Sequence, residues 1–214
     1  GFNAFEDCGF KELSLPASLC DIYMNAFAYC KNLVKVDLSK TNVKEIGCFA
    51  NCYALEEVRF PQNLTGIGYE CFKGCSSIVT LNLPSSLLTL SGKDFLGMSS
   101  LTEIDLSNTK IKGISDACFK DCSSLQKVVF PKSLESINNS AFENATALKQ
   151  VDLSNTTVHN ISTSSFAGCR SLEQVSLAEN TDTIGNLAFS GCSNLAEVRN
   201  TNHVKIVFDG AFEG

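Results

Sequence analysis

The sequence predicts a repeat solenoid, a single domain over residues 1–214 in which one short unit is wound about nine times into a curved right-handed coil. Three observations support this fold class. A phenylalanine returns every 22–24 residues, a small residue follows three positions later in most units, and an alternating apolar pair comes next. The phenylalanines are Phe5, Phe27, Phe49, Phe72, Phe95, Phe119, Phe142, Phe166, Phe189 and Phe212. A pattern needed this often indicates architecture rather than an active site.

The apolar pair predicts a short strand in each unit. In Val36-Asp37-Leu38 the outer residues are apolar and the middle one is polar, which is the period of two of a strand with one buried face. Later pairs are Val58 and Phe60, Leu81 and Leu83, Ile104 and Leu106, Val128 and Phe130, Val151 and Leu153, and Val175 and Leu177. Equivalent strands of neighbouring coils should therefore pair in parallel and form a β-sheet along one face, in a rod about 40 Å long.

Two kinds of turn follow the strands. Some units carry a proline, as in FPQNL (60–64), and others read DLSNT, as at 105–109. Pro, Asn and Ser favour turns at such places. An aliphatic residue then usually precedes the next phenylalanine by five positions, although the second unit is two residues short and Ile46 stands only three before Phe49.

The A-F-x-x-C segment around each phenylalanine is too short for a stable helix. We expect one helical or 3₁₀ turn there. With this turn the unit is complete, and its length of about 23 residues lies in the leucine-rich-repeat range.

Two segments carry a resemblance to a known family. LEEVRFPQNLTGIGYECFKGC (55–75) and LQKVVFPKSLESINNSAFENA (125–145) resemble the BspA-like, or Treponema pallidum-type, leucine-rich repeat almost position for position. The DLSNT units depart from that pattern because they lack the proline. The resemblance covers the whole chain and implies a leucine-rich-repeat solenoid with a parallel sheet on one face and short strands, turns or 3₁₀ segments elsewhere. It also implies a place among proteins of bacteria and parasitic protists, several of which are surface proteins that bind host matrix proteins or other cells.

The eleven cysteines mostly occupy one recurring position, three residues after the phenylalanine. Met98 and Ala145 hold the same position in other units, so the position requires packing and not thiol chemistry. Neighbouring side chains on such a ladder point the same way, which is poor geometry for a disulfide. We therefore expect free, buried thiols, with Cys20 as the exposed exception because it aligns with an outward position.

A zinc site is the sharper alternative for some of these cysteines. C-x-x-x-C occurs at Cys48/Cys52 and Cys71/Cys75, one coil apart, so four thiolates could gather around one ion. The position of Cys48 and Cys71 is held elsewhere by Ala4, Ala26, Ala141 and Ala188, which favours simple packing. The sequence therefore predicts no metal and no cofactor.

The remaining composition excludes several functions. The chain has two histidines, no tryptophan and no catalytic or phosphate-binding motif, and we expect no enzymatic activity. Its net charge of −6 argues against nucleic acid as a partner. No run of 18 apolar residues occurs, so we expect no membrane insertion by this segment. Because neither end resembles the polar cap that solenoids need, we expect a piece of a longer protein.

The outward-facing strand residues are the predicted partner-binding surface. They carry mixed charge without a stripe of one sign, which suits a protein partner better than a polyanion. The alternative interpretation is that these residues are polar only because the sheet face is solvated, with no partner bound there. One row is Asp37, Arg59, Asn82, Asp105, Val129, Asp152, Ser176 and Arg199, and the row beside it includes Lys35, Glu57, Glu103 and Lys127.

Five N-x-S/T sequences mark possible glycosylation sites. Their number is close to what this composition gives by chance, so they are weak evidence for secretion. The five asparagines are Asn63, Asn138, Asn144, Asn155 and Asn160.

Two functions from different classes remain. The first is a protein-binding module of a cell-surface or secreted adhesin that recognises host matrix or cell-surface proteins, which is what the family resemblance implies. The alternative is a cytoplasmic scaffold or regulatory protein-interaction module, which the expected free thiols suit equally well. The sequence does not identify the ligand, because a repeat scaffold is generic and specificity depends on surface residues.

Overall fold

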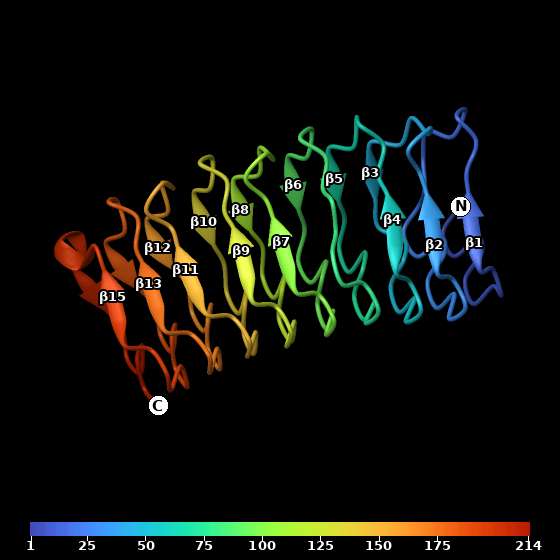
Figure 1. Cartoon of the computed structure of the whole chain (residues 1–214). Helices are drawn as coiled ribbons and strands as arrows, with labels where there is room; N and C mark the ends of the chain where they lie inside the picture. The colour runs from blue at the N-terminus through green and yellow to red at the C-terminus, as the bar shows by residue number, and fades with distance from the viewer.

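The computed structural model describes all residues, 1–214, and is a parallel β-solenoid of about nine turns (Figure 1). Two rows of short strands run along the rod. The front sheet contains β1 (Glu12–Ser14), β2 (Lys35–Asp37), β4 (Glu57–Arg59), β7 (Glu103–Asp105), β9 (Lys127–Val129), β11 (Gln150–Asp152), β13 (Gln174–Ser176) and β15 (Glu197–Arg199). The back sheet contains β3 (Glu45–Ile46), β5 (Gly66–Ile67), β6 (Thr89–Leu90), β8 (Gly113–Ile114), β10 (Ser136–Ile137), β12 (Asn160–Ile161), β14 (Thr183–Ile184) and β16 (Ile206–Val207).

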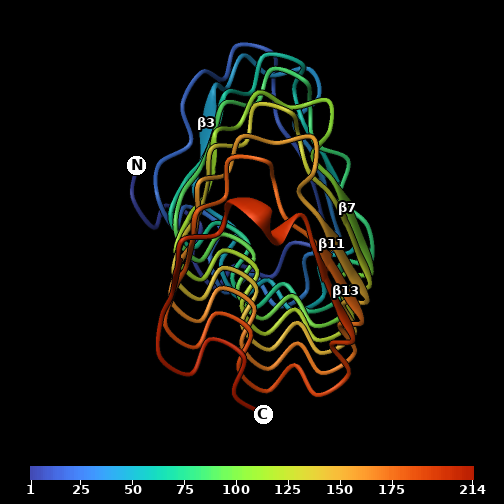
Figure 2. The same ribbon diagram turned by 90° about the vertical axis from the view of Figure 1, so that its left-hand side faces the viewer.

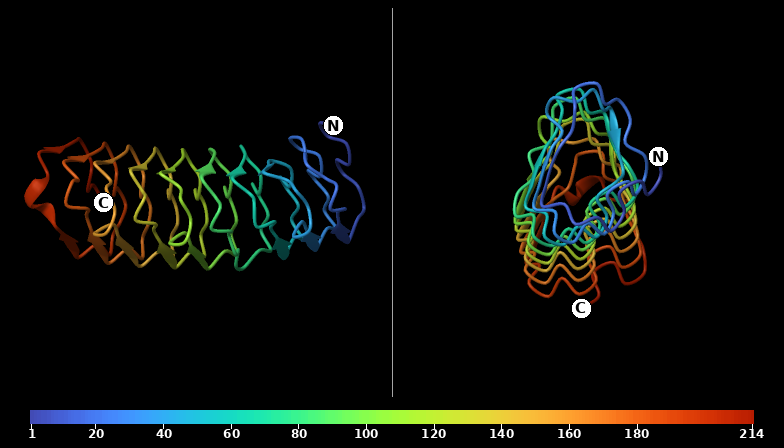
Figure 3. Two further views of the ribbon diagram at one scale, coloured as in Figure 1. Left: turned by 90° about the horizontal axis from the view of Figure 1, so that it is seen from above. Right: turned by 90° about the vertical axis from the view of Figure 1, so that its right-hand side faces the viewer.

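The two sheets lie on opposite sides of each coil. Figure 2 shows β7, β11 and β13 on one side and β3 on the other, with a zigzag of turns closing the base. Seen from above, the rod is only slightly curved (Figure 3). All strand pairs are parallel, and residues one coil apart are in register, as in Val36 opposite Val58. The predicted solenoid is therefore confirmed, and so are its front strands except the one predicted at Leu81 and Leu83.

One predicted strand is reduced to a single bridge. Between β4 and β7, the segment around Leu81 forms only the bridge of Thr80 with Glu103. The coil stays tied to its neighbour there, because the Thr102 N–H donates to the Val79 carbonyl at 3.0 Å. The front sheet is thus a row of three regular ladders, β1-β2-β4, β7-β9 and β11-β13-β15, and the back sheet is interrupted once, between β6 and β8.

The expectation of a helical or 3₁₀ turn at A-F-x-x-C is wrong. The Phe49 N–H donates to the Cys71 carbonyl at 2.9 Å and the Asn51 N–H to the Lys73 carbonyl at 2.7 Å, so alternate groups bond to the next coil. Left-handed backbone at the position before the cysteine, as at Asn51 (φ 59°) and Gly74 (φ 72°), produces this zigzag. A helix would satisfy its donors internally and would leave neighbouring coils untied. The 3₁₀ turn of the chain is η1 (Thr201–His203), near its end.

The phenylalanines form one continuous stack through the core. Ring centroids of neighbouring coils lie 4.9–6.0 Å apart with interplanar angles of 0–18°. The inner rings from Phe49 to Phe189 are buried, whereas Phe5 and Phe212, which end the stack, are 46% and 45% exposed. The buried cluster extends continuously along the coils, as expected for a solenoid in which each coil contacts only its neighbours.

All eleven cysteines are thiols, nine of them buried, and Cys20 is exposed as predicted. The ladder thiols do more than fill space. The Cys52 Sγ lies 3.1 Å from the Phe27 carbonyl oxygen of the preceding coil, and Cys75 makes the same bond to Phe49 at 3.1 Å. Burial raises the pKa of the Cys52 thiol to about 12. Burial raises the pKa of Cys75 as well, so both thiols are protonated donors and poor nucleophiles at neutral pH.

We expect a thiol probe added to the folded protein to label Cys20 first and the buried ladder only after denaturation. The reason is that both access and thiolate formation are suppressed by burial. Mass spectrometry of the labelled peptides measures the order. As a matched variant, Cys52→Ala should stay folded, because Ala145 holds the equivalent position, and it should lose about 1 kcal/mol for the thiol bond. Rapid labelling of the whole ladder in the native protein would contradict this.

Candidate functional site

The front sheet brings the predicted surface residues onto one face. Strand register places Lys35 beside Glu57 and Asp37 beside Arg59. Further along, it places Glu103 beside Lys127. The whole set, partly or fully exposed, is Asp37, Arg59, Asn82, Asp105, Val129, Asp152, Ser176, Arg199, Lys35, Glu57, Glu103 and Lys127. Period-two alternation with parallel register is enough to align them, because every second side chain points outward.

Ion pairs order the two ends of this face. The Glu57 carboxylate lies 2.8 Å from Lys35 Nζ and 2.6 Å from Arg59 Nε. At the other end, Arg199 Nε lies 2.8 Å from Glu197. Hydrogen bonds from Lys35 and then Arg59 lower the pKa of Glu57. Such exposed pairs contribute little stability, so their main effect is to fix the side chains of a mixed-charge surface.

Three aspartates of this face have a structural role that the sequence reading missed. Asp37, Asp105 and Asp152 each accept the backbone N–H of the serine two residues later, at 2.9, 2.8 and 3.0 Å. Hydrogen bonds from that serine lower the pKa of Asp37 and of Asp105. This is an Asx-turn, and it starts the DLSNT loop where other units use proline. The signal was the spacing of Asp and Ser in D-L-S.

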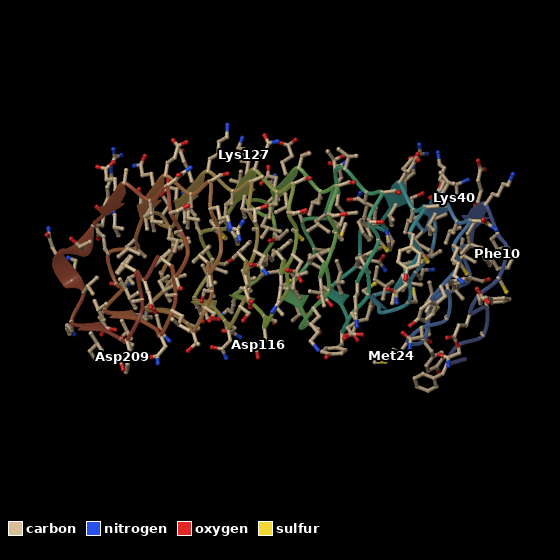
Figure 4. The ribbon with its side chains drawn as sticks, turned by 90° about the horizontal axis from the view of Figure 1, so that it is seen from below. Phe10, Met24, Lys40, Asp116, Lys127 and Asp209 are labelled. Atoms are coloured by element: carbon tan, nitrogen blue, oxygen red, sulfur yellow. The ribbon has the colours of Figure 1, made fainter.

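The middle of the face is hollowed around Val129. A hollow of about 520 Å³ runs over Val129, Phe130 and Asp152, and a smaller one of about 140 Å³ runs over Asn82, Asp105 and Lys127. Lys127 and Val129 line both, so the two hollows adjoin. Lys127 lies at one long edge of the molecule in Figure 4. A shallow, mixed-charge surface of this kind suits a protein side chain better than a buried small molecule.

The possible glycosylation sites are dispersed. Asn63, Asn144, Asn155 and Asn160 are exposed, and Asn138 is half-buried in the turn after β10. Asn155 borders the front hollow, whereas Asn160 lies on the back sheet. They do not gather on one edge of the rod.

The other candidate residues do not assemble a reactive site. His159 and His203 line one open hollow with Glu179 and Asp182. No group of three or more His, Cys, Asp or Glu side chains is placed to hold a metal ion. The structure contains no helix with the length and apolar character needed to cross a bilayer.

A rod of stacked parallel coils with a broad, shallow, polar sheet face defines a repeat module for protein interaction. The chain belongs to the BspA-type leucine-rich-repeat family, whose model, a region of six copies, matches residues 1–97, 45–157 and 92–214. This fold is a non-catalytic repeat scaffold. The family resemblance found in the sequence is therefore confirmed.

Solved structures support the same assignment. The chain is similar to a leucine-rich repeat protein from Bacteroides ovatus, with 28% identity, coverage of 97% of this chain and 68% of the other, and a TM-score of 0.61. It is also similar to the T. pallidum leucine-rich repeat protein, at 25% identity, 87% and 78% coverage, and a TM-score of 0.60. The pneumococcal vaccine antigen PcpA shares the fold, at 20% identity, 95% and 59% coverage, and a TM-score of 0.50. No curated protein sequence matches the chain significantly.

Proposed function

We propose that the chain is the protein-binding module of a cell-surface or secreted BspA-like adhesin, and that it binds a host matrix or cell-surface protein through the front sheet. The observation that carries this proposal is the pair of adjoining hollows that Lys127 and Val129 share within a row of mixed charge. Membership of the BspA-type family supports it further, because the resemblance to that family implies a surface or secreted protein. Sheet faces of solenoids are common binding surfaces.

A cytoplasmic scaffold is the second candidate. Nine buried thiols without a disulfide favour it, because disulfides are common in secreted proteins and rare in the cytosol. Antibody labelling of intact and permeabilised cells of the source organism distinguishes the two. Labelling of intact cells is expected for the adhesin, and labelling only after permeabilisation would support the scaffold.

Charge reversal at Lys127 or Arg59 is expected to weaken partner binding about ten-fold or more, because a central interface contact can contribute about 1–4 kcal/mol. The partner is first found by screening immobilised matrix proteins and cell surfaces, and affinities are then measured by surface plasmon resonance. Both side chains are exposed, so Lys127→Glu and Arg59→Glu should leave the unfolding temperature nearly unchanged. Aspartates of the Asx-turns are unsuitable for this test, because their reversal would disrupt the loop.

The matched controls are Lys40→Glu and Lys110→Glu, which reverse exposed charges in the turns beyond the front strands. These variants should bind nearly as well as the parent. If the turn variants lose binding while the front-sheet variants keep it, the binding surface is an edge of the solenoid and the front sheet is the wrong site.

A further inference from the structure

The short second unit leaves a notch in the side of the rod. In the third coil five steps lead from Ile67 to Phe72, whereas in the second only three lead from Ile46 to Phe49. The missing pair corresponds to Tyr69 and Glu70, which form the corner between the back sheet and the base in the third coil. The second coil therefore lacks this corner, whereas the first and third coils on either side of it have one.

The resulting hollow has a volume of about 810 Å³ and lies between the first and third coils. Gly47 and Gly68 lie in it side by side, and a Cβ on Gly68 would come within 3.1 Å of the Ile46 carbonyl oxygen. Glycine there keeps the backbones close and places no side chain in the notch. Met24 also lines the hollow, and Figure 4 shows it at the long edge opposite Lys127. The notch is thus separate from the front sheet.

Two tyrosines flank the notch. Tyr23 of the first coil is 50% exposed and Tyr69 of the third is 46% exposed. Phe2 packs on Tyr23 at 5.3 Å between centroids, and Lys93 Nζ lies 5.4 Å from the centroid of Tyr69. Phe2 and Lys93 belong to coils outside the pair, so the space of the second coil stays open between the rings. Coils two apart are separated by about 10 Å, which is enough for one flat group between two side chains.

The charged residues that line the notch indicate what kind of group it binds. Asp21 and Glu45 line the notch, are exposed and make no ion pair, and the one lining cation, Lys44, is also unpaired. The Glu45 side chain extends over Gly66, where an added Cβ would lie 3.3 Å from Glu45 Cγ. Aromatic rings with nearby carboxylates attract cations, and a planar guanidinium both stacks on a ring and binds a carboxylate with two hydrogen bonds.

We propose that this notch receives an arginine side chain of a protein partner, with the guanidinium between Tyr23 and Tyr69 and paired with Glu45. The proposal rests on the chain being a protein-binding module, but not on the front sheet as its binding face. A neutral side chain of the same shape would gain neither the cation–π attraction nor the ion pair.

The test is a titration of the ¹⁵N-labelled protein with the blocked peptide acetyl-Gly-Arg-Gly-amide, followed by NMR. We expect saturable shifts of the Gly47 and Gly68 amide signals, with Gly168 and Gly191 unmoved as distant references. The counterpart peptide with citrulline, which is neutral and of nearly equal shape, should give no saturable shift. Equal responses to both peptides, or no saturation with either at tens of millimolar, would overturn the proposal.

Variants locate the site. Glu45→Gln and Tyr23→Ala should each weaken binding about two- to five-fold. Their matched controls, Glu56→Gln and Tyr53→Ala, change exposed residues outside the notch and should bind like the parent. Inserting Ser-Asn between Gly47 and Cys48 gives the second coil the spacing of the third and should abolish binding. If this variant does not fold, the point variants at Glu45 and Tyr23 test the proposal.

The front-sheet variants separate the two proposals. Lys127→Glu should leave peptide binding unchanged even if it abolishes binding to a natural partner. If the insertion variant is folded and binds the arginine peptide like the parent, the notch is not the site.

Discussion

Replacing Phe119 by alanine is expected to lower the free energy of unfolding by about 3–5 kcal/mol. Phe119 is fully buried, and its ring stacks on Phe95 at 4.9 Å and on Phe142 at 5.1 Å. Alanine would remove both aromatic contacts and leave a cavity between two rigid coils, which inter-coil hydrogen bonds prevent from collapsing. Urea unfolding followed by circular dichroism measures the loss.

The matched control is Phe212→Ala, at the end of the same stack. Phe212 is 45% exposed and stacks on one ring only, Phe189 at 5.3 Å. Less apolar surface is lost and no enclosed cavity forms, so we expect a loss of about 1–2 kcal/mol. Similar losses for the two variants would show that the stack does not couple the coils. Because each coil contacts only its neighbours, the central variant should also broaden the transition by weakening the link between the two halves.

Much of this architecture could be predicted because it depends on repetition. A phenylalanine or valine that recurs once per coil must stack on its own equivalents, so burial of Phe119 and of Val36 follows from spacing alone. The same logic placed Cys20 outside, since it aligns with an exposed position. Strand register then aligned Lys35 with Glu57 without further information.

The failures arose where a residue depends on a partner other than its own equivalent in the next coil. The A-F-x-x-C segment could pass for a helical turn because some of its N–H groups, such as that of Cys52, do bond within the segment, whereas alternate ones, such as that of Phe49, bond to the next coil. The shortened second unit was visible in the sequence, but the notch also needs Tyr23 and Tyr69 on either side. The Asx role of Asp105 was missed because its D-L-S spacing was read as a generic turn.

Asp94 is another such case, a carboxyl group in a position that elsewhere holds small residues. It precedes Phe95 as Ala141 precedes Phe142, and it is fully buried. Its Oδ2 accepts the Ser91 N–H at 2.6 Å, while Oδ1 has no hydrogen-bond partner. Burial is the main cause that raises the pKa of Asp94 to about 10. The side chain is therefore neutral in the folded protein at neutral pH.

This raised pKa has a direct consequence for stability. In the unfolded chain an aspartate has a pKa of about 3.9, so between about pH 4 and pH 10 the folded state holds one proton more than the unfolded state. The free energy of unfolding then falls as pH rises through this window. The stabilising contribution of the neutral form is complete only below about pH 4.

Asp94→Ala is expected to stabilise the protein at neutral pH, with a gain that grows by about 1–3 kcal/mol between pH 5 and pH 7. Alanine suits the position, as Ala26 and Ala141 show, and the Ser91 N–H keeps the Ile67 carbonyl as acceptor at 3.1 Å. Subtracting parent from variant at each pH cancels the carboxylates that both proteins share. Asp94→Asn, neutral at every pH, should show the same pH trend without the change in side-chain size. The expectation is contradicted if the gain in the free energy of unfolding is equal at pH 5 and pH 7, or if the variant is less stable than the parent at pH 7. Either result would mean that Asp94 is ionised in the folded protein and that its Oδ1 has a partner such as water.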